Sequence, residues 1–203
     1  MKRNYQRELD ELLRELNGAR KTLLLHSCCG PCSSYCLEYL TQYFDVTVFW
    51  YNPNILPTAE WDKRLFWQKQ LLETAPFGRG VKLLVPGREE EAFWQAAKGL
   101  ESEREGGARC TECFRLRLSR TAEAAEQGGY DFFATTLTVS PHKDAERINR
   151  IGEELGKKYG VAWLPSDFKK RNGYLRSIQL AKEFGLYRQD WCGCGYSHTE
   201  EKN

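Results

Sequence analysis

The chain has 203 residues, with 30 basic and 28 acidic side chains, three His and eight Cys. This length predicts one domain, and an apolar content of 41% is enough for a real core, which excludes a disordered chain. No run approaches 18 consecutive apolar residues, which excludes a membrane span, and the start MKRNYQRELDELL lacks the features of a signal peptide. We therefore expect a protein of the reducing cytoplasm, where eight cysteines indicate metal or redox chemistry rather than structural disulfides.

The charges are unevenly distributed along the chain. The formal net charge is +2, but residues 143–190 carry eleven Lys or Arg side chains against seven Asp or Glu. A basic region of this kind is compatible with a polyanionic partner such as a nucleic acid. An ordinary solvated surface often has the same composition, so charge alone leaves the partner open.

The first half of the chain alternates helical and strand patterns. Apolar residues at Leu9, Leu12 and Leu16 fall on one face and predict a helix over 5–17. The apolar run 22–26 predicts a buried strand that leads directly into a cysteine cluster. Pro31 suits the first turn of a helix, which we expect to continue to about residue 43. The next elements are predicted as a strand over 45–51, a helix over 58–74 and a strand over 81–85.

The second half continues the alternation. Helices are predicted over 89–100 and 113–126, a strand over 131–136, a helix over 144–159, a strand over 161–164 and a helix over 174–184. This pattern predicts an α/β fold with a doubly wound, mostly parallel sheet. In such sheets ligands bind beyond the carboxyl ends of the strands, which is where the chain places its first cysteines.

The eight cysteines fall into three groups. These are Cys28-Cys29-Gly30-Pro31-Cys32 with Cys36 one turn on, Cys110-Thr111-Glu112-Cys113, and Cys192-Gly193-Cys194. Adjacent cysteines cannot chelate one atom comfortably but can reach different irons of a cluster. Four thiolates from Cys28, Cys29, Cys110 and Cys113 would fit a [4Fe–4S] cluster. The alternative is a structural zinc site, whose usual pattern is two Cys-x-x-Cys pairs on short loops.

The other cysteines allow several roles. The residues leave open whether Cys32 is a ligand of a second metal, a redox thiol or a packing residue at the helix start. We expect Cys36 to be a small buried hydrophobic residue. A bridge between Cys192 and Cys194 would be strained and easily reduced, which suits a redox-active pair, and the flexible Gly193 would permit it. The alternative is that both are metal ligands.

Five segments carry the most distinctive motifs of the chain. They are Cys28-Cys29-Gly30-Pro31-Cys32, Arg109-Cys110-x-x-Cys113, Thr136-Leu137-Thr138-x-Ser140-Pro141-x-Lys143, Asp167-Phe168-Lys169-Lys170-x-x-Gly173-Tyr174-x-Arg176-Ser177, and Tyr187-Arg188-Gln189-x-x-Cys192-Gly193-Cys194-x-Tyr196-Ser197. In this order they resemble the motifs of the QueH type of epoxyqueuosine reductase. The similarity runs from about Thr22 to Ser197, and its one small departure is Gly30, which is often Ala in the family. We therefore expect a domain over 22–197, preceded by an N-terminal helical extension over 1–21 and followed by a tail over 198–203.

The resemblance implies a fold and an activity. The fold would be similar to that of the adenine-nucleotide alpha-hydrolases (HUP, Rossmann-like). The activity would be the cobalamin-independent reduction of epoxyqueuosine to queuosine in the tRNA anticodon loop, the last step of queuosine biosynthesis. The resemblance also implies a cluster held by Cys28, Cys29, Cys110 and Cys113, and a redox-active pair at Cys192 and Cys194. An additional iron at Cys32 is an option, and an external electron donor of unknown identity is required.

The reaction itself sets requirements that the residues meet in part. Removal of an epoxide oxygen to leave an alkene needs two electrons and two protons, so a second redox element beside a one-electron cluster is useful. Candidates for the proton donor are Asp190, Tyr196 and the three His residues, and Asp190 is the working assignment.

Cations near predicted strand ends are candidates for phosphate contacts, which supply affinity rather than sequence reading. They are Lys143, Lys169, Lys170, Arg171, Arg176 and Arg188. The aromatic residues Trp50, Tyr51, Trp61 and Trp191, if exposed, would stack on a splayed loop nucleotide. Each single cation is equally compatible with a solvated surface and each aromatic residue with a core contact, so only the clustering favours RNA binding.

Rival functions differ from this one in identifiable features. An ATP-dependent tRNA thiolase would carry a Ser-Gly-Gly-x-Asp-Ser loop after the first strand, where this chain has His26-Ser27-Cys28-Cys29-Gly30-Pro31. Another thiol or iron–sulfur reductase, acting on a disulfide or a different modified nucleotide, would share the vicinal cysteines but not their distance from the Cys-x-x-Cys. A zinc-stabilised RNA-binding module is the non-enzyme alternative, and a colourless zinc protein would favour it.

Overall fold

The computed structural model describes residues 3–197 of the chain. Its elements in chain order are α1 (Tyr5–Glu15), β1 (Lys21–His26), α2 (Gly30–Leu40), β2 (Phe44–Phe49), α3 (Thr58–Thr74), the 3-10 helix η1 (Pro76–Gly78), β3 (Lys82–Leu84), α4 (Glu90–Ala97), α5 (Ala108–Gln127), β4 (Phe132–Thr135), the 3-10 helix η2 (Thr136–Val139), α6 (Ala145–Tyr159), β5 (Ala162–Trp163) and α7 (Gly173–Glu183). The predicted order of helices and strands is confirmed.

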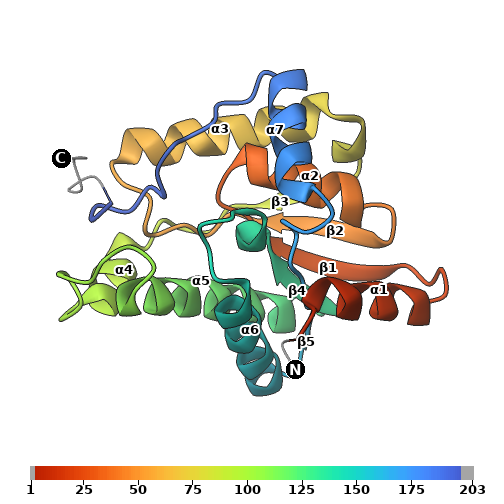
Figure 1. Ribbon diagram of the computed structural model, residues 1–203, viewed down its shortest axis with the longest axis horizontal. Coiled ribbons are helices and arrows are strands. Elements are labelled where there is room, and N and C mark those ends of the chain that lie inside the picture. Colours follow the sequence, from red (N-terminus) through yellow and green to blue (C-terminus); the bar gives the residue numbers. More distant parts are fainter. Residues whose placement is uncertain (1–2, 198–203) are drawn as a thin grey trace.

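The five strands form one parallel sheet in the order β3-β2-β1-β4-β5. From β1 the chain first moves outward through β2 to β3, and it then returns to the other side of β1 to form β4 and β5. Figure 1 shows helices on both faces of the sheet. The prediction of a doubly wound, parallel α/β fold is therefore confirmed. The direction reverses between β1 and β4, and ligands of such folds bind at the carboxyl ends of the strands at this point.

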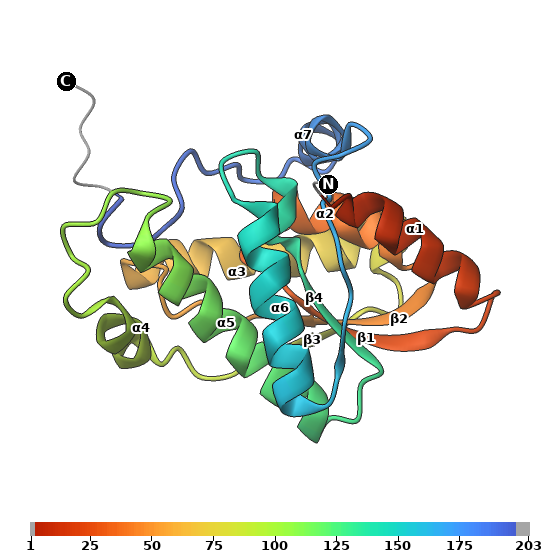
Figure 2. The ribbon, with the colours of Figure 1, turned by 60° about the horizontal axis from the view of Figure 1, so that its bottom comes forward.

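Two apolar layers enclose the sheet because successive side chains of a strand point to opposite faces. In β1, Leu23 and Leu25 pack into one layer and Leu24 into the other. The first layer includes apolar residues of α1, α2, α3 and α7, and the second those of α5 and α6. Figures 1 and 2 show α2, α3 and α7 on one side of the sheet and α5 and α6 on the other.

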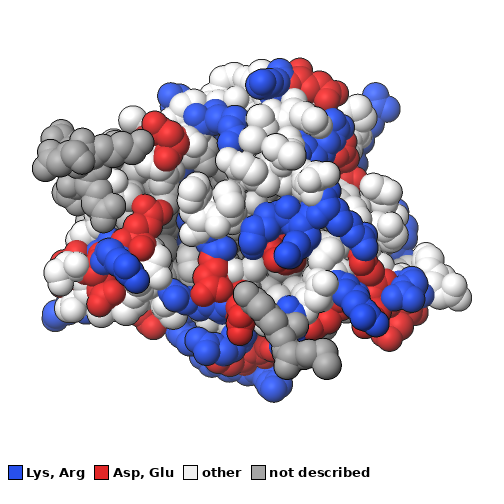
Figure 3. Space-filling model, in the orientation of Figure 1, with Lys and Arg blue, Asp and Glu red and all other residues white. Residues whose placement is uncertain are grey.

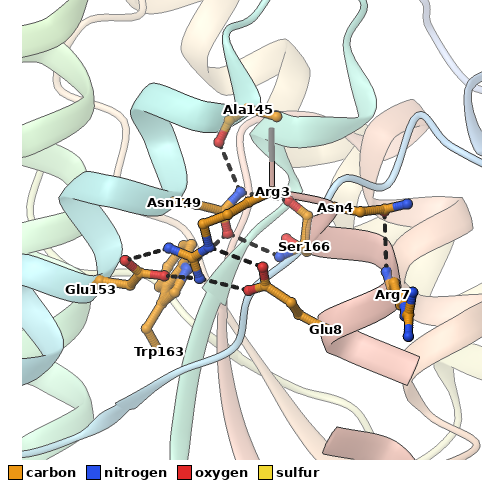
Figure 4. A network of polar contacts seen from close by, with 9 residues as sticks. All are labelled: Arg3, Asn4, Arg7, Glu8, Ala145, Asn149, Glu153, Trp163 and Ser166. Atoms are coloured by element: carbon orange, nitrogen blue, oxygen red, sulfur yellow. Dashed lines mark hydrogen bonds and ion pairs between the residues drawn. The ribbon is translucent and has the colours of Figure 1, made fainter. Parts of the chain in front are cut away.

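Helix α1 packs against this core. Leu9 is fully buried in the first apolar layer. At the start of the helix, the Arg3 guanidinium lies 2.6 Å from a carboxylate oxygen of Glu8 and 2.7 Å from one of Glu153 in α6, so it joins the two helices (Figure 4). The division of the chain at residue 22 remains a prediction, and the predicted tail over 198–203 lies outside the described residues.

The chain beyond β5 is fixed by one buried amide. The Asn149 side chain donates to the carbonyl oxygens of Ala145 and Ser166, and its oxygen accepts from the Ser166 N–H and the Trp163 indole N–H, all at 2.7–3.0 Å (Figure 4). All four hydrogen-bonding positions of this carboxamide are thus used. They hold the segment after β5 at the carboxyl edge of the sheet.

Helix α5 begins at Ala108, five residues before the predicted start at 113. The residues before it, Gly106-Gly107, have the composition of a loop, and Gly107 provides no side-chain cap. The cap comes from Glu103, whose carboxylate accepts the Ala108 N–H at 3.0 Å. Local capping patterns do not include this spacing. The earlier start places Cys110 in the first turn of the helix instead of in the preceding loop.

Candidate functional site

The first cysteine group lies at the reversal point of the sheet. Strand β1 ends at His26, and Cys28 follows it beside the carboxyl end of β4. Cys29 is the N-cap residue of α2, and its carbonyl oxygen accepts the Ser33 N–H at 3.1 Å. Pro31 occupies the first turn as predicted, where its missing N–H would have had no helical partner.

The second group lies on the first two turns of α5. Cys110 and Cys113 are three residues apart and therefore lie on the same side of the helix. The Gly106 N–H points to the Cys110 sulfur at 3.2 Å. The buried Arg109 donates to the carbonyl oxygens of Glu101 at 2.8 Å and of neighbouring residues, which closes the loop that precedes α5. The start of the helix is thus held in place by the loop it follows.

The third group is a loop held by a buried cation. Arg64 of α3 is 1% exposed and forms an ion pair with Glu60 at 2.6 Å. The remaining nitrogens of its guanidinium donate to the carbonyl oxygens of Cys192, at 3.1 Å, and Trp191, at 3.3 Å. On the other side of the loop, the Gly193 carbonyl oxygen accepts the Leu56 N–H at 2.8 Å. The Cys192–Cys194 loop therefore has a defined position beside α3.

The three groups meet at one cavity, which we call the cysteine cavity. It is lined by Cys28, Asn54, Phe93, Arg109, Cys110, Cys113, Phe114, Arg117, Lys143, Cys192 and Cys194. Five lining residues are thiols and three are cations, and none of these described residues is acidic. Arg117 is 3% exposed and donates to the Cys113 carbonyl oxygen at 3.3 Å. Sulfur donors surrounded by cations suit an anionic thiolate-ligated metal centre, because the buried negative charge is compensated.

The thiols of the cysteine cavity differ in acidity. A hydrogen bond from Cys194 lowers the pKa of Cys192 well below its usual value, and the positive charge of Lys143 contributes. The same hydrogen bond, with burial, raises the pKa of Cys194. Burial also raises the pKa of Cys113. The two shifts favour Cys192 over Cys194 as the thiolate of the pair, and a thiolate is the reactive form in thiol–disulfide exchange.

A larger groove, which we call the outer groove, adjoins the cysteine cavity. Its volume is about 770 Å³, and it shares Cys28, Lys143 and Cys192 with the cavity. Its other lining residues are Pro31, Cys32, Arg64, Glu105, Gly106, Ser140, His142, Tyr174, Ser177, Arg188, Gln189, Asp190 and Trp191. The segment after α7 supplies four of these, and Figures 1 and 2 show it running from α7 past α3 toward α4. The groove gives a large ligand a path to the thiols.

The predicted RNA-binding cations are divided between the groove and its surroundings. Lys143 and Arg188 line the outer groove. Arg176 pairs with Glu38, Arg171 with Asp10 and Lys169 with Asp167, and Lys170 is exposed. Figure 3 shows Lys and Arg side chains gathered over the middle of this face, near the loop that leads into α7. Tyr174 and Ser177 of α7 line the groove, so this cationic surface adjoins it.

Three of the four aromatic residues that were candidates for base stacking are buried, so the stacking prediction is wrong for them. Trp50 and Tyr51 are fully buried and Trp61 is 7% exposed, because the end of β2 and the start of α3 pack into the core. The fourth, Trp191, lines the outer groove and lies under the Arg64 guanidinium, 5.3 Å from its ring centre.

Not every candidate proton donor has access to a ligand. His26 is completely buried, with both ring nitrogens bonded to neighbours, so this candidate is wrong. Asp190 and His142 are exposed and line the outer groove. Tyr196 packs against Trp94 and under the Arg109 guanidinium, with ring contacts of 5.6 and 4.4 Å. The third histidine, His198, lies outside the described residues.

The remaining cysteines occupy different surroundings. Cys32 lines the outer groove instead of the cysteine cavity. Cys29 is buried next to Cys28 and does not line the cysteine cavity. A hydrogen bond from Cys28 lowers the pKa of Cys29. The hydrogen bond to Cys32 and burial outweigh this effect and raise the pKa to about 12. Cys36 is fully buried in the apolar core, as predicted.

Several lining residues were not predicted from the sequence. Arg109 was noted only as part of a motif, and Arg64, Arg117 and Asn54 were not identified as site residues. For Asn54 a signal exists, because the Asn52-Pro53-Asn54 turn directly follows a buried strand whose carboxyl end faces the ligand side of the sheet.

Among residues 3–197, no three His, Cys, Asp or Glu side chains converge closely enough to hold a metal ion. No helix in this part of the chain is long and apolar enough to cross a membrane.

Comparison with known proteins identifies the family. A family model described as epoxyqueuosine reductase QueH matches residues 23–200. The chain is 43% identical to epoxyqueuosine reductase QueH of Staphylococcus epidermidis, over 98% of this chain and 86% of that protein, and 42% identical to that of Streptococcus pyogenes serotype M1, over 96% and 78%. It is 36% identical to that of Thermotoga maritima, over 89% and 92%. The chain therefore belongs to the epoxyqueuosine reductase QueH family and is an oxidoreductase.

Proposed function

We propose that the protein reduces epoxyqueuosine to queuosine at the wobble position of tRNA anticodon loops, the last step of queuosine biosynthesis. One observation carries the proposal: in a member of this family, a cavity lined by five thiols shares Cys28, Lys143 and Cys192 with a larger groove at the reversal point of the sheet. The groove is large enough for a nucleotide side group, and its thiols supply reducing chemistry. We place this activity in the cytoplasm and in the domain over residues 22–197.

The overall reaction converts an epoxide, two electrons and two protons into an alkene and water. A thiolate–thiol pair supplies both electrons and one proton when it becomes a disulfide, so the second proton must come from another group, for which Asp190 is proposed. Cys192 and Cys194 are the pair proposed for this step; both line the cysteine cavity, and the lowered pKa of Cys192 supports the assignment. An external electron donor then returns the disulfide to the dithiol state.

An iron–sulfur cluster suits the donor set of the cysteine cavity. We propose that Cys28, Cys29, Cys110 and Cys113 hold a [4Fe–4S] cluster, which when bound would supply electrons singly. Three of these residues line the cavity, and the fourth is buried beside Cys28. The reaction uses no cobalamin in this proposal. Cys32 faces the outer groove and is the proposed ligand of an additional iron, if one is bound.

The outer groove is the proposed site of the anticodon loop. Lys143 and Arg188 line it, and Lys169, Arg171 and Arg176, which form ion pairs with carboxylates, and Lys170 are the further cations proposed to contact the tRNA. Contacts of these cations to phosphates would supply affinity. Trp191 offers a ring for a splayed base. Asp190 lies in the same groove and is the proposed donor of a proton to the departing oxygen.

The decisive experiment is anaerobic incubation of the purified protein with a reductant and tRNA that carries epoxyqueuosine, followed by nucleoside mass analysis. The expected product is queuosine, which is lighter by one oxygen. Metal analysis and a visible spectrum of the same preparation report on the cofactor. A colourless protein that contains zinc and leaves epoxyqueuosine unchanged would instead support a zinc-stabilised RNA-binding module, because thiols also bind zinc.

A further inference from the structure

Asn54 is a buried residue of the cysteine cavity whose side-chain oxygen has no hydrogen-bond partner among residues 3–197. The residue is 2% exposed and lines the cavity together with the thiols. Its side-chain oxygen accepts no hydrogen bond from any described residue. Most buried polar atoms in proteins are paired, because an unpaired one costs roughly 1–3 kcal/mol, so each exception calls for an explanation. The buried Asn149 carboxamide, by comparison, makes four hydrogen bonds.

The position of Asn54 is set by contacts on both sides. Two residues before it, the Asn52 amide donates to the Ser27 carbonyl oxygen at 2.7 Å, directly before Cys28. Two residues after it, the Leu56 N–H donates to the Gly193 carbonyl oxygen at 2.8 Å, between the cysteines of the third group. The turn that carries Asn54 therefore bridges the first and third cysteine groups. This arrangement holds the amide between the proposed cluster ligands and the redox-active pair.

The chemistry of a carboxamide suits an uncharged oxygen in this cavity. Apart from the thiols, Asn54 is the only neutral hydrogen-bonding side chain among the described residues that line it. An amide offers two N–H donors and a carbonyl acceptor, and rotation by 180° exchanges them. For Asn54 that rotation breaks no hydrogen bond of its oxygen. The N–H donors match an epoxide oxygen, which only accepts, and the same donors continue to match that oxygen as charge develops on it.

We propose that the Asn54 carboxamide donates a hydrogen bond to the epoxide oxygen of the substrate in the cysteine cavity. The inference rests on the proposed function and assigns a residue that recognises the epoxide and distinguishes it from the product, which lacks this oxygen. Asn54 positions the oxygen between the thiols and stabilises charge on it while the carbon–oxygen bonds break. Loss of one such donor in other enzymes lowers the rate by about 10²–10³-fold.

The test compares Asn54→Leu with the wild-type protein. Leu has a similar shape and no polar atoms, so the exchange removes the hydrogen bond with little change in packing. The first readout is binding without reductant, measured by competition between one tRNA carrying epoxyqueuosine and the same tRNA carrying queuosine; nucleoside analysis confirms that the epoxide persists. We expect the wild-type protein to prefer the epoxide by about fivefold in Kd, and the variant to bind both equally. Affinity for the queuosine tRNA and iron content stay unchanged.

The second readout is the single-turnover rate at saturating tRNA, which we expect to fall by about 10²–10³-fold in Asn54→Leu. Thr136→Val is the matched control, since Thr136 is also fully buried with an unpaired side-chain oxygen but lines neither cavity. It should keep both the preference and the rate. If Asn54→Leu fails to fold or loses iron, Asn54→Ala is measured in the same way.

The outcomes separate the two proposals. A wild-type protein that converts epoxyqueuosine, with an Asn54→Leu variant that keeps both its rate and its preference, would overturn the inference and leave the proposed function standing. A wild-type protein that converts no epoxyqueuosine would overturn the proposed function. The inference would also be overturned if the wild-type protein bound the epoxyqueuosine tRNA and the queuosine tRNA with the same Kd.

Discussion

The Arg64 guanidinium lies against Gly193 at the place where any other residue would carry its Cβ. A Cβ built on Gly193 would be 3.0 Å from the nearest guanidinium nitrogen, and Gly193 has a φ of +97°. Both observations favour glycine at this position. The absence of a side chain lets Arg64 approach closely enough to bind the carbonyl oxygens of the two residues before Gly193. Gly193 therefore leaves room for the arginine that holds the Cys192–Cys194 loop in place, in addition to giving the loop flexibility.

Gly193→Ala should impair turnover more than its effect on stability would explain. The left-handed backbone alone costs an alanine about 1–2 kcal/mol, and displacement of Arg64 would also shift Cys192. A shift of about 1 Å can lower a rate by about a hundredfold. Gly99→Ala is the matched control, because Gly99 has a φ of +79° with no atom near its would-be Cβ. Denaturant unfolding should show a loss of stability in both variants, larger in Gly193→Ala because Arg64 is displaced, and single-turnover assays a rate loss only in Gly193→Ala. Equal rates would contradict the role given to Arg64.

Local patterns in the sequence were sufficient for the order of the elements. The helix predicted over 58–74 coincides with α3, and the strand predicted over 22–26 differs from β1 by one residue. These segments combine strong apolar periodicity with clear ends. The start of α5 was missed because its cap, Glu103, reaches across a loop, and such a contact depends on the folded chain.

The candidate site was predictable where its residues carry reactive chemistry. Cysteines are rare enough that their spacing indicates a shared site, and the structure brings members of all three groups to one cavity. The burial of Trp50 and Trp61 was not predictable in the same way, because the local sequence around a Trp does not distinguish a surface position from a core position. The roles of Arg64 and Asn54 depend on contacts across more than 120 residues, such as the one from Arg64 to Cys192.

Removal of a thiol from α5 should cost the protein its iron. Cys110→Ala and Cys113→Ala each delete a proposed ligand that the cavity cannot replace, so iron, sulfide and activity should fall together. Cys36→Ala is the control, since this thiol is buried in the apolar core and should leave the iron content unchanged. Iron and sulfide analysis of anaerobically purified protein checks the prediction. Full iron content in the α5 variants would place the cluster elsewhere.

Cys192→Ser should keep the cluster but stop turnover. Serine cannot form the disulfide state, so the pair would no longer deliver two electrons. The variant should retain the iron content and visible spectrum of the wild-type protein, and nucleoside analysis should show unchanged epoxyqueuosine. A variant that arrives without iron would identify Cys192 as a ligand instead of a redox thiol.

His26 should make stability depend on pH. Its Nε2–H donates to the Tyr51 carbonyl oxygen at 3.1 Å, so Nδ1 accepts from the Thr135 hydroxyl at 2.8 Å, and burial lowers its pKa from 6.5 to about 3. Between these values the unfolded chain binds a proton that the folded protein does not. The stabilisation is complete above pH 6.5 and is lost as the pH falls toward 3, by up to about 1.4 kcal/mol per pH unit.

The measurement is urea unfolding between pH 7.5 and 5. His26→Gln should flatten the dependence of the unfolding free energy on pH, although the variant is less stable overall because it loses buried hydrogen bonds. His142→Gln is the control, since His142 is exposed. A dependence that stays equally steep in His26→Gln would mean that other groups cause it.

The loop before α7 tests the proposed position of the tRNA. It follows β5 at the carboxyl edge of the sheet and leads into the helix that borders the outer groove. Lys169 and Arg171 of this loop pair with Asp167 and Asp10, so removal of the cations also leaves two carboxylates uncompensated. Both effects should weaken the attraction of a polyanion.

Replacement of Lys169, Lys170 and Arg171 by Ala should raise the Kd for tRNA and flatten its dependence on salt. Each cation that neutralises a phosphate releases a condensed counterion, which contributes a slope of roughly −0.7 on single strands, so three contacts would change the slope by about 2. The double variant Lys157→Ala/Lys158→Ala is the matched control, because these cations lie on the last turn of α6, near the opposite edge of the sheet. Binding titrations at several salt concentrations, with the visible spectrum as a check on the cluster, measure the slopes. A slope unchanged in the triple variant but flattened in the control would move the tRNA to the face of α6.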